Sequence, residues 1–249
     1  MRKILTSIAA ATLLFGISLS AAAAPGWLAT GLTVMPENAP KVVAALDALF
    51  DSKVGRKLPG RVILRANLAD GNNPETHAIV SLFRSAAESE AYRAELWADP
   101  AWGEFMAAMR GLNETAGSTM RGMIAYNSGE RADSDVVWVN HYVTVSEPAV
   151  LLSAMRSYSQ SATGQAAPGQ VHLSAVTAGG VGSASHIISV GWASEAEWES
   201  EVQRTAGNPQ WNALIRTMRA VAEYHGATLQ RDIKSWGKAS VEEITNLGN

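Results

Sequence analysis

One stretch of this chain occurs twice. Residues 59–110 read PGRVILRANLADGNNPETHAIVSLFRSAAESEAYRAELWADPAWGEFMAAMR, and residues 168–219 read PGQVHLSAVTAGGVGSASHIISVGWASEAEWESEVQRTAGNPQWNALIRTMR. At a constant shift of 109, without a gap, 17 of these 52 positions are identical. Upstream, Trp27 matches Trp138 and Val34 matches Val145 at a shift of 111. The pattern indicates an internal duplication.

The duplication divides the chain into segments. We expect a signal peptide at residues 1–23, a first repeat at 24–128, a linker at 129–135, a second repeat at 136–237 and a C-terminal tail at 238–249. Arg2 and Lys3 precede an apolar run, and Ala21 and Ala23 fit the −3 and −1 positions of a cleavage site. The sequence therefore predicts a periplasmic or secreted protein that leaves the membrane once its signal is cleaved.

Each repeat shows the same order of hydrophobic patterns. Residues rich in β-branched and aromatic side chains predict first strands at 27–34 and 136–145, and apolar residues at helical spacing follow at 41–50 and 149–158. A Pro-Gly turn opens a second strand, a hairpin leads to a third, and last strands are expected at 118–126 and 228–233. The order βαββαβ is that of a split βαβ unit, and two such sheets are expected to pack face to face.

The starts of the helices between the third and last strands are well marked. Ser85 with Glu88, and Ser194 with Glu197, have the spacing of capping boxes. Asp99-Pro100 and Asn208-Pro209 read as a cap followed by proline at the first helical position. Each repeat should therefore contain two helices in series here.

The second repeat resembles the dimeric α/β-barrel superfamily, and in particular its antibiotic-biosynthesis-monooxygenase branch. The resemblance rests on Pro168-Gly169, on Trp192-Ala-Ser194-Glu-Ala-Glu197 and on Asn208-Pro209-Gln-Trp211. It implies an α+β fold in which two tandem ferredoxin-like βαββαβ units form one barrel within the chain. Members include cofactor-free oxygenases, isomerases, cyclases, haem-degrading enzymes and haem-binding chlorite dismutases, so the fold does not choose a function.

The haem-degrading members carry a histidine where this chain has Met106 and Ile215, which argues against that activity. The chain has no cysteine and a net charge of −3, with scattered Lys and Arg. Thiol chemistry and nucleic-acid binding are therefore not expected. No histidine pair has metal-ligand spacing, so no metal site is predicted.

Paired histidines are the strongest chemical signal. His77 and His186 occupy the same position of the third strand in both repeats, and either could be a hydrogen-bonded structural residue or a functional one. In the second repeat His186 shares a strand face with Trp192, and His141 and His172 are expected on neighbouring strands. We predict His186 as the catalytic base and Trp192, His141 and His77 as ligand-binding residues.

The predicted function is binding of an apolar or aromatic small molecule, with cofactor-independent oxygenation, isomerisation or cyclisation as the chemistry. Two alternatives stay open. One is a non-catalytic periplasmic ligand-binding or interaction protein. The other is a haem protein of chlorite-dismutase-like architecture, so haem is the one cofactor to be tested, and an oligomer is compatible with either.

Overall fold

The computed structural model describes residues 24–71, 73–113, 118–128, 133–179 and 184–245. The first half contains β1 (Gly26–Leu32), α1 (Ala39–Asp51), β2 (Arg61–Ala69), β3 (His77–Phe83), α2 (Ala86–Ala98), α3 (Pro100–Met109) and β4 (Thr119–Asn127). Short 3-10 turns flank α1 at Pro36–Asn38 and Gly55–Lys57. The predicted order of strands and helices is confirmed in this half.

The second half repeats that order. It contains β5 (Val137–Val145), α4 (Pro148–Ser159), α5 (Ala162–Gln165), β6 (Val171–Gly179), β7 (His186–Trp192), α6 (Glu195–Thr205), α7 (Pro209–Val221) and β8 (Ala222–Trp236). The short helix α5 is an addition, and β8 is much longer than the strand predicted at 228–233. The predicted signal peptide at 1–23 and residues 129–132 of the predicted linker lie outside the described residues.

All eight strands join into one closed antiparallel barrel in the order β1-β3-β2-β8-β5-β7-β6-β4. Each half contributes four adjacent strands, and the halves meet where β2 pairs with β8 and where β4 pairs with β6. The sheets therefore join edge to edge and do not stack as two separate layers, because each sheet would otherwise expose two unpaired edges. The length of β8 has the same cause, since it pairs with β5 along its first part and with β2 along its second.

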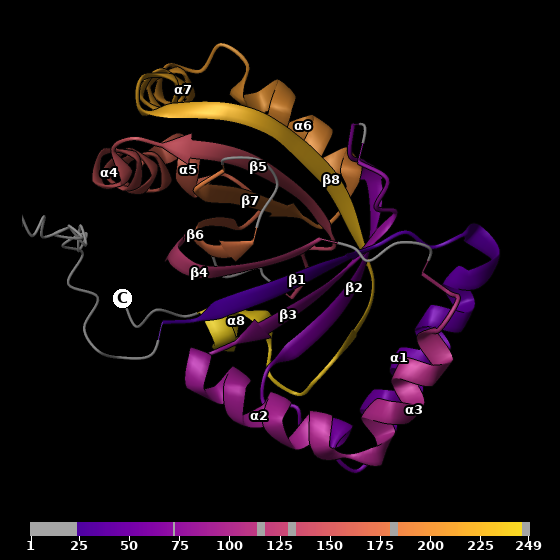
Figure 1. Cartoon of the computed structure of the whole chain (residues 1–249). Helices are drawn as coiled ribbons and strands as arrows, with labels where there is room; N and C mark the ends of the chain where they lie inside the picture. Colours follow the sequence, from indigo (N-terminus) through magenta and orange to yellow (C-terminus); the bar gives the residue numbers. More distant parts are fainter. Residues whose placement is uncertain (1–23, 72, 114–117, 129–132, 180–183, 246–249) are drawn as a thin grey trace, which may run out of the picture.

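The helices lie outside the barrel. Figure 1 shows α1, α2 and α3 on one side of it and α4, α6 and α7 on the opposite side. Alternation along the strands sends one set of side chains to the helices and the other into the barrel. On β5, for example, Val139, His141 and Val143 face the helices, whereas Asn140 and Tyr142 line the barrel interior.

The predicted helix starts are confirmed. The hydroxyl of Ser85 accepts a hydrogen bond from the Glu88 amide at 3.0 Å, and that of Ser194 accepts one from the Glu197 amide at 3.1 Å. Asp99 and Asn208 likewise cap α3 and α7. These local bonds fix where each outer helix leaves the sheet.

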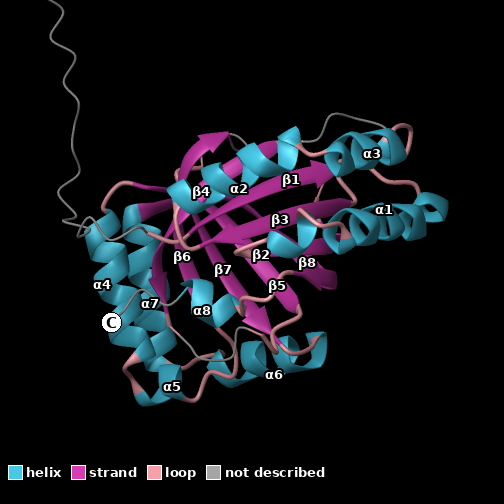
Figure 2. Ribbon diagram, turned by 90° about the horizontal axis from the view of Figure 1, so that it is seen from below, coloured by secondary structure: helices cyan, strands magenta, loops and turns pink. Residues whose placement is uncertain are grey.

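Residues 238–245 of the predicted tail do not extend away from the fold. They include the short helix α8 (Val241–Thr245), whose Ile244 is 1% exposed and packs with Ile63 and Leu82 of the barrel interior. The Asn127 side-chain amide donates to Thr245 Oγ1 at 3.0 Å. Figure 2 shows α8 against the barrel opening. Within the described ranges, no helix combines the length and apolar character needed to cross a bilayer.

Candidate functional site

A large cavity lies in the second half, between the outer face of its sheet and helices α4, α6 and α7. Its volume is about 950 Å³. The sheet contributes Val139, His141, Val143, Val171, Ile188, Val190, Trp192 and Tyr224, and the helices contribute Met155, Tyr158, Trp198, Val202, Thr205, Trp211, Leu214 and Met218. We call this space the half-two cavity. Its walls are mainly apolar and aromatic, as in most small-molecule sites.

The corresponding space in the first half is filled. There Phe50 stacks on Trp236 with ring centres 5.4 Å apart, and Leu96 and Phe105 complete a continuous buried core. At the repeat shift of 109, Phe50 is matched by Ser159 and Leu96 by Thr205. Both replacements are smaller and polar. The hydroxyl of Ser159 hydrogen bonds to the Tyr126 hydroxyl at 2.6 Å and does not fill the space.

The backbone of α6 also contributes to the opening. Helix α2 continues to Ala98, whereas the matching position in the second half is Gly207, which has φ of +74°. A left-handed glycine just past a helix end is a common stop signal. Helix α6 therefore ends at Thr205, and the chain turns before α7 begins at Pro209.

His141 is the one histidine among the described residues that line this cavity. Its ring lies 6.1 Å from the ring of Tyr224, and burial lowers the pKa of His141 below its usual value. Neither ring nitrogen has a hydrogen-bond partner within the described part of the chain. A neutral imidazole with a free nitrogen, facing an apolar cavity, can accept a proton from a bound molecule.

Aromatic rings form two further walls. Trp192 and Trp198 lie with ring centres 6.2 Å apart, and Tyr158 meets Trp211 edge-on at 5.5 Å. Trp192 is 6% exposed, so its indole is held rigidly at the sheet side. Such paired rings offer flat surfaces to an aromatic ligand. The structure thus brings two of the predicted site residues, His141 and Trp192, to one cavity.

His186 and His77 are placed differently. Neither is among the residues that line the half-two cavity or the barrel interior. His186 Nδ1 lies 2.8 Å from the Ser185 hydroxyl, and that hydroxyl accepts a hydrogen bond from the Val145 amide at 3.0 Å. His77 Nδ1 lies 2.9 Å from the hydroxyl of its own preceding residue, Thr76.

The hydroxyl of Thr76 accepts from the Val34 amide at 2.9 Å, so the two halves share one arrangement. In each, a hydroxyl joins the start of the third strand to the end of the first strand, and the histidine completes the hydrogen-bonding chain. Such repetition is expected of a structural element of both units. His141 thus lines the half-two cavity, whereas His186 and His77 lie away from it.

Several cavity residues had no individual signal in the sequence. Tyr224 lies on the part of β8 that was not predicted as a strand, and Leu214 and Met155 read as ordinary core residues. The signal that could have revealed this cavity is a comparison of matching core positions in the two repeats. Ser159 and Thr205 stand where the first half has Phe50 and Leu96, and a repeat that loses bulk at two core positions must repack or leave a space.

His141 is the one histidine among the described lining residues of the half-two cavity that could ligate a haem iron. A histidine that ligates a metal almost always donates its second ring N–H to a carboxylate, a carbonyl or water. His141, the only cavity histidine in the described ranges, has no such protein acceptor. No group of three His, Cys, Asp or Glu within those ranges is placed to hold a metal ion. A haem-ligating His141 would therefore depend on water as the acceptor for its second ring N–H.

No family model and no curated protein matches the sequence. Solved structures do match. A proposed monooxygenase of Lactobacillus acidophilus NCFM superposes with a TM-score of 0.59 and 10% identity, covering 88% of this chain and 98% of that one. An anthrone oxidase-like protein gives 0.55 and 14%, covering 88% and 94%.

A haem-binding protein of Thermus thermophilus gives a TM-score of 0.51 and 7% identity, covering 85% of this chain and 92% of that one. At these identities the likeness concerns the fold and not the activity. The matches extend over nearly the whole of each chain, and both halves of the barrel take part. This protein therefore has the dimeric α/β-barrel fold, with both ferredoxin-like units in a single chain.

Proposed function

We propose that the protein binds a largely apolar, aromatic small molecule in the half-two cavity and that His141 acts there as a general base. The observation that carries the proposal is the position of His141. It is the one described histidine facing a cavity of about 950 Å³, and its nitrogens are free to meet a ligand. The aromatic walls, including Trp192 and Trp211, favour a fused-ring ligand over an aliphatic chain.

The reaction class to test first is oxidation of an activated ring carbon by O₂. His141 would accept the proton of an acidic C–H, which leaves a delocalised carbanion against the aromatic walls. Reaction of a ring CH₂ with one O₂ gives a ketone and one water, so the substrate supplies all the electrons and no external reductant is needed. The low pKa of His141 keeps the imidazole in its proton-accepting form near neutral pH.

The similar structures support this order of tests without deciding it. A proposed monooxygenase and an anthrone oxidase-like protein share the fold, and anthrone is a tricyclic molecule with an acidic CH₂. Simple binding without turnover is the competing function, and the same experiment distinguishes the two.

The test uses anthrone as ligand and substrate. Binding is followed by quenching of tryptophan fluorescence under argon, and turnover by O₂ consumption with formation of anthraquinone. Substitution His141→Phe should reduce turnover by at least about 100-fold while preserving binding, because phenylalanine keeps the ring volume but cannot accept a proton. Substitution His186→Ala is the matched control and should retain turnover.

A second variant tests the location. The double substitution Thr205→Leu with Leu214→Phe restores the side chains that fill the first half at Leu96 and Phe105. It should fill the half-two cavity and abolish anthrone binding while leaving the protein folded. Unchanged anthrone binding in this variant would show that the ligand binds outside the half-two cavity. Binding without turnover in the wild type would show that the protein is a ligand carrier and not an enzyme for this substrate.

We also propose that the protein is exported. Support comes from the basic, apolar and small-residue regions of residues 1–23. Mass spectrometry of the protein from its native host should give Ala24 as the first residue. A mature chain that retains residues 1–20 would contradict export by cleavage.

A further inference from the structure

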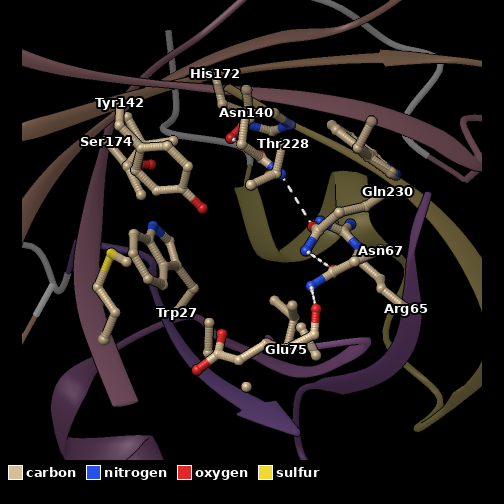
Figure 3. Close-up of a pocket in the computed structure, with 18 of the residues that line it drawn as sticks. Trp27, Arg65, Asn67, Glu75, Asn140, Tyr142, His172, Ser174, Thr228 and Gln230 are labelled. Atoms are coloured by element: carbon tan, nitrogen blue, oxygen red, sulfur yellow. Dashed lines mark hydrogen bonds between the residues drawn. The ribbon is translucent and has the colours of Figure 1, made fainter. Parts of the chain in front are cut away.

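A second, separate cavity lies inside the barrel. Its volume is about 120 Å³, and Figure 3 shows residues that line it. Among the described residues it shares no lining residue with the half-two cavity, and most of its walls are the inward faces of the strands. The function proposed above does not use this inner cavity.

The two halves of the chain give this cavity two kinds of wall. Strands of the first half contribute mainly apolar side chains, namely Trp27, Ala29, Ala78, Val80, Leu82, Met120 and Ile124. Strands of the second half contribute mainly polar ones, namely Asn140, Tyr142, His172, Ser174, Ser189, Thr228 and Gln230. The cavity is therefore amphipathic across its width.

Most polar groups of the interior are already satisfied by one another. The Gln230 amide donates to Asn67 at 2.8 Å, Asn140 donates to Gln230 at 3.0 Å, and the Ser189 hydroxyl donates to Asn140 at 2.7 Å. This chain of bonds crosses from β2 through β8 and β5 to β7. It holds the polar wall rigid, since each amide is fixed from both sides.

His172 is one of two exceptions, the other being Trp138, whose indole Nε1 is also buried without a hydrogen-bond partner. His172 is 6% exposed, and its Nε2 atom lies 2.6 Å from Gln170 Oε1, which makes Nε2 the protonated nitrogen. The other nitrogen, Nδ1, is buried and has no hydrogen-bond partner. An unsatisfied buried acceptor is destabilising, and a molecule that donates a hydrogen bond to it removes that cost.

The charges of the interior indicate a neutral occupant. Arg65 is already paired with Asp232 at 2.8 Å and lies over the Trp138 ring, so it offers no free charge. At the opening, the carboxylates of Asp70 and Glu75 face the cavity and repel anions. Arg65 opposes a cation placed beside His172.

We propose that the barrel interior binds a small neutral molecule of about one ring, with a hydroxyl that donates to His172 Nδ1 and a hydrocarbon face against the apolar wall. A dry protein cavity of about 150 Å³ is known to hold benzene, so the volume suits a phenol-sized body. Figure 3 shows the Tyr142 hydroxyl and the Trp27 indole pointing into the same space, where each can contact the ring of such a ligand.

The probe is phenol, and anisole, which has the same ring but no donor, is its control. Ligand-detected NMR gives the affinities, and nuclear Overhauser effects to methyl groups locate the ligand. In the wild type we expect phenol contacts to Ile124 and Ile187, which line the barrel cavity. Phenol should bind at least about 10-fold more tightly than anisole, which corresponds to one hydrogen bond.

Substitution His172→Phe keeps a ring but removes the acceptor. Phenol should then lose about 10-fold in affinity while anisole is unchanged. The Thr205→Leu/Leu214→Phe protein should bind phenol normally, which separates this site from the half-two cavity. Contacts only to Val190 or Leu214, or no phenol binding at all, would overturn the proposal. If His172→Phe does not fold, the wild-type contacts and the phenol–anisole difference still decide it.

Discussion

The guanidinium carbon of Arg65 lies 4.8 Å from the centre of the Trp138 ring. Arg65 comes from β2 of the first half and Trp138 from β5 of the second, so this cation–π contact crosses the seam at β8. The ring of His172 also packs near this indole, at 5.7 Å between ring centres. The barrel interior thus places a fixed positive charge and a buried imidazole near each other, and their proximity affects stability at low pH.

Burial, with a smaller contribution from the Arg65 charge, lowers the pKa of His172 from 6.5 to about 3. The unfolded chain therefore binds a proton at a pH where the folded chain does not. The stability due to neutral His172 is complete above pH 6.5 and is lost as the pH falls toward 3. At pH 4.5 the loss should be roughly 2–3 kcal/mol.

Urea unfolding of wild type and His172→Gln at pH 7.5 and 4.5 measures this effect. The variant cannot titrate at this position, so the difference in unfolding free energy between the two proteins should shrink or reverse in acid. A difference that is equal at both pH values would show that His172 is not a buried neutral group.

The two capping serines should contribute similar stability. Ser85→Ala and Ser194→Ala each remove an acceptor for a backbone amide, at 3.0 and 3.1 Å, and should each cost about 1 kcal/mol in unfolding free energy. Chemical denaturation monitored by circular dichroism checks both. Midpoints equal to that of the wild type would mean that water replaces the hydroxyl at no cost.

Gly207→Ala tests the early end of α6. Nothing lies within 4 Å of the added Cβ, but the backbone has φ of +74°, so the substitution should cost about 1 kcal/mol through backbone strain alone. Gly103→Ala is the matched control, because Gly103 lies inside α3 in open space and alanine should stabilise that helix by up to about 1 kcal/mol. Changes of the same sign in both variants would contradict the left-handed stop at Gly207.

Helix α8 should behave as part of the core. Ile244→Ala should cost about 2–3 kcal/mol, near the lower end for a buried residue of this size, because a five-residue helix can detach before the full cost is reached. Limited proteolysis should then cut the chain near residue 238. Glu242→Ala, at an exposed position of the same helix, should change neither property.

Substitution of the paired histidines, His77 and His186, should affect stability, whereas substitution of His141 should affect turnover. His77→Ala and His186→Ala each remove a hydrogen bond to a neighbouring hydroxyl and should each cost about 1 kcal/mol. His141→Ala breaks no hydrogen bond and should leave the urea midpoint nearly unchanged, while anthrone turnover falls. A large stability loss in His141→Ala alone would assign it a structural role and would remove it as the candidate base.

The sequence determined much of this structure because the signals were local. The repeat at a shift of 109, the alternation along each strand and the caps at Ser85 and Ser194 depend only on neighbours along the chain. From them follow two units of the same order, the helix starts and the two faces of each strand. The barrel itself came from a family resemblance, since pairing of β2 with β8 joins residues from opposite halves.

Only the tertiary structure decided where a ligand could bind. The sequence favoured His186 as the base because it is paired with His77, but which face of the barrel each histidine occupies, and what lies there, depends on the tertiary structure. The half-two cavity exists because Ser159 and Thr205 fail to fill a space bounded by three separate helices. The inner cavity is lined by strands of both halves and by Val241 and Thr245 of α8. Packing joins residues that are far apart in the chain, so no local pattern could show how much space they leave.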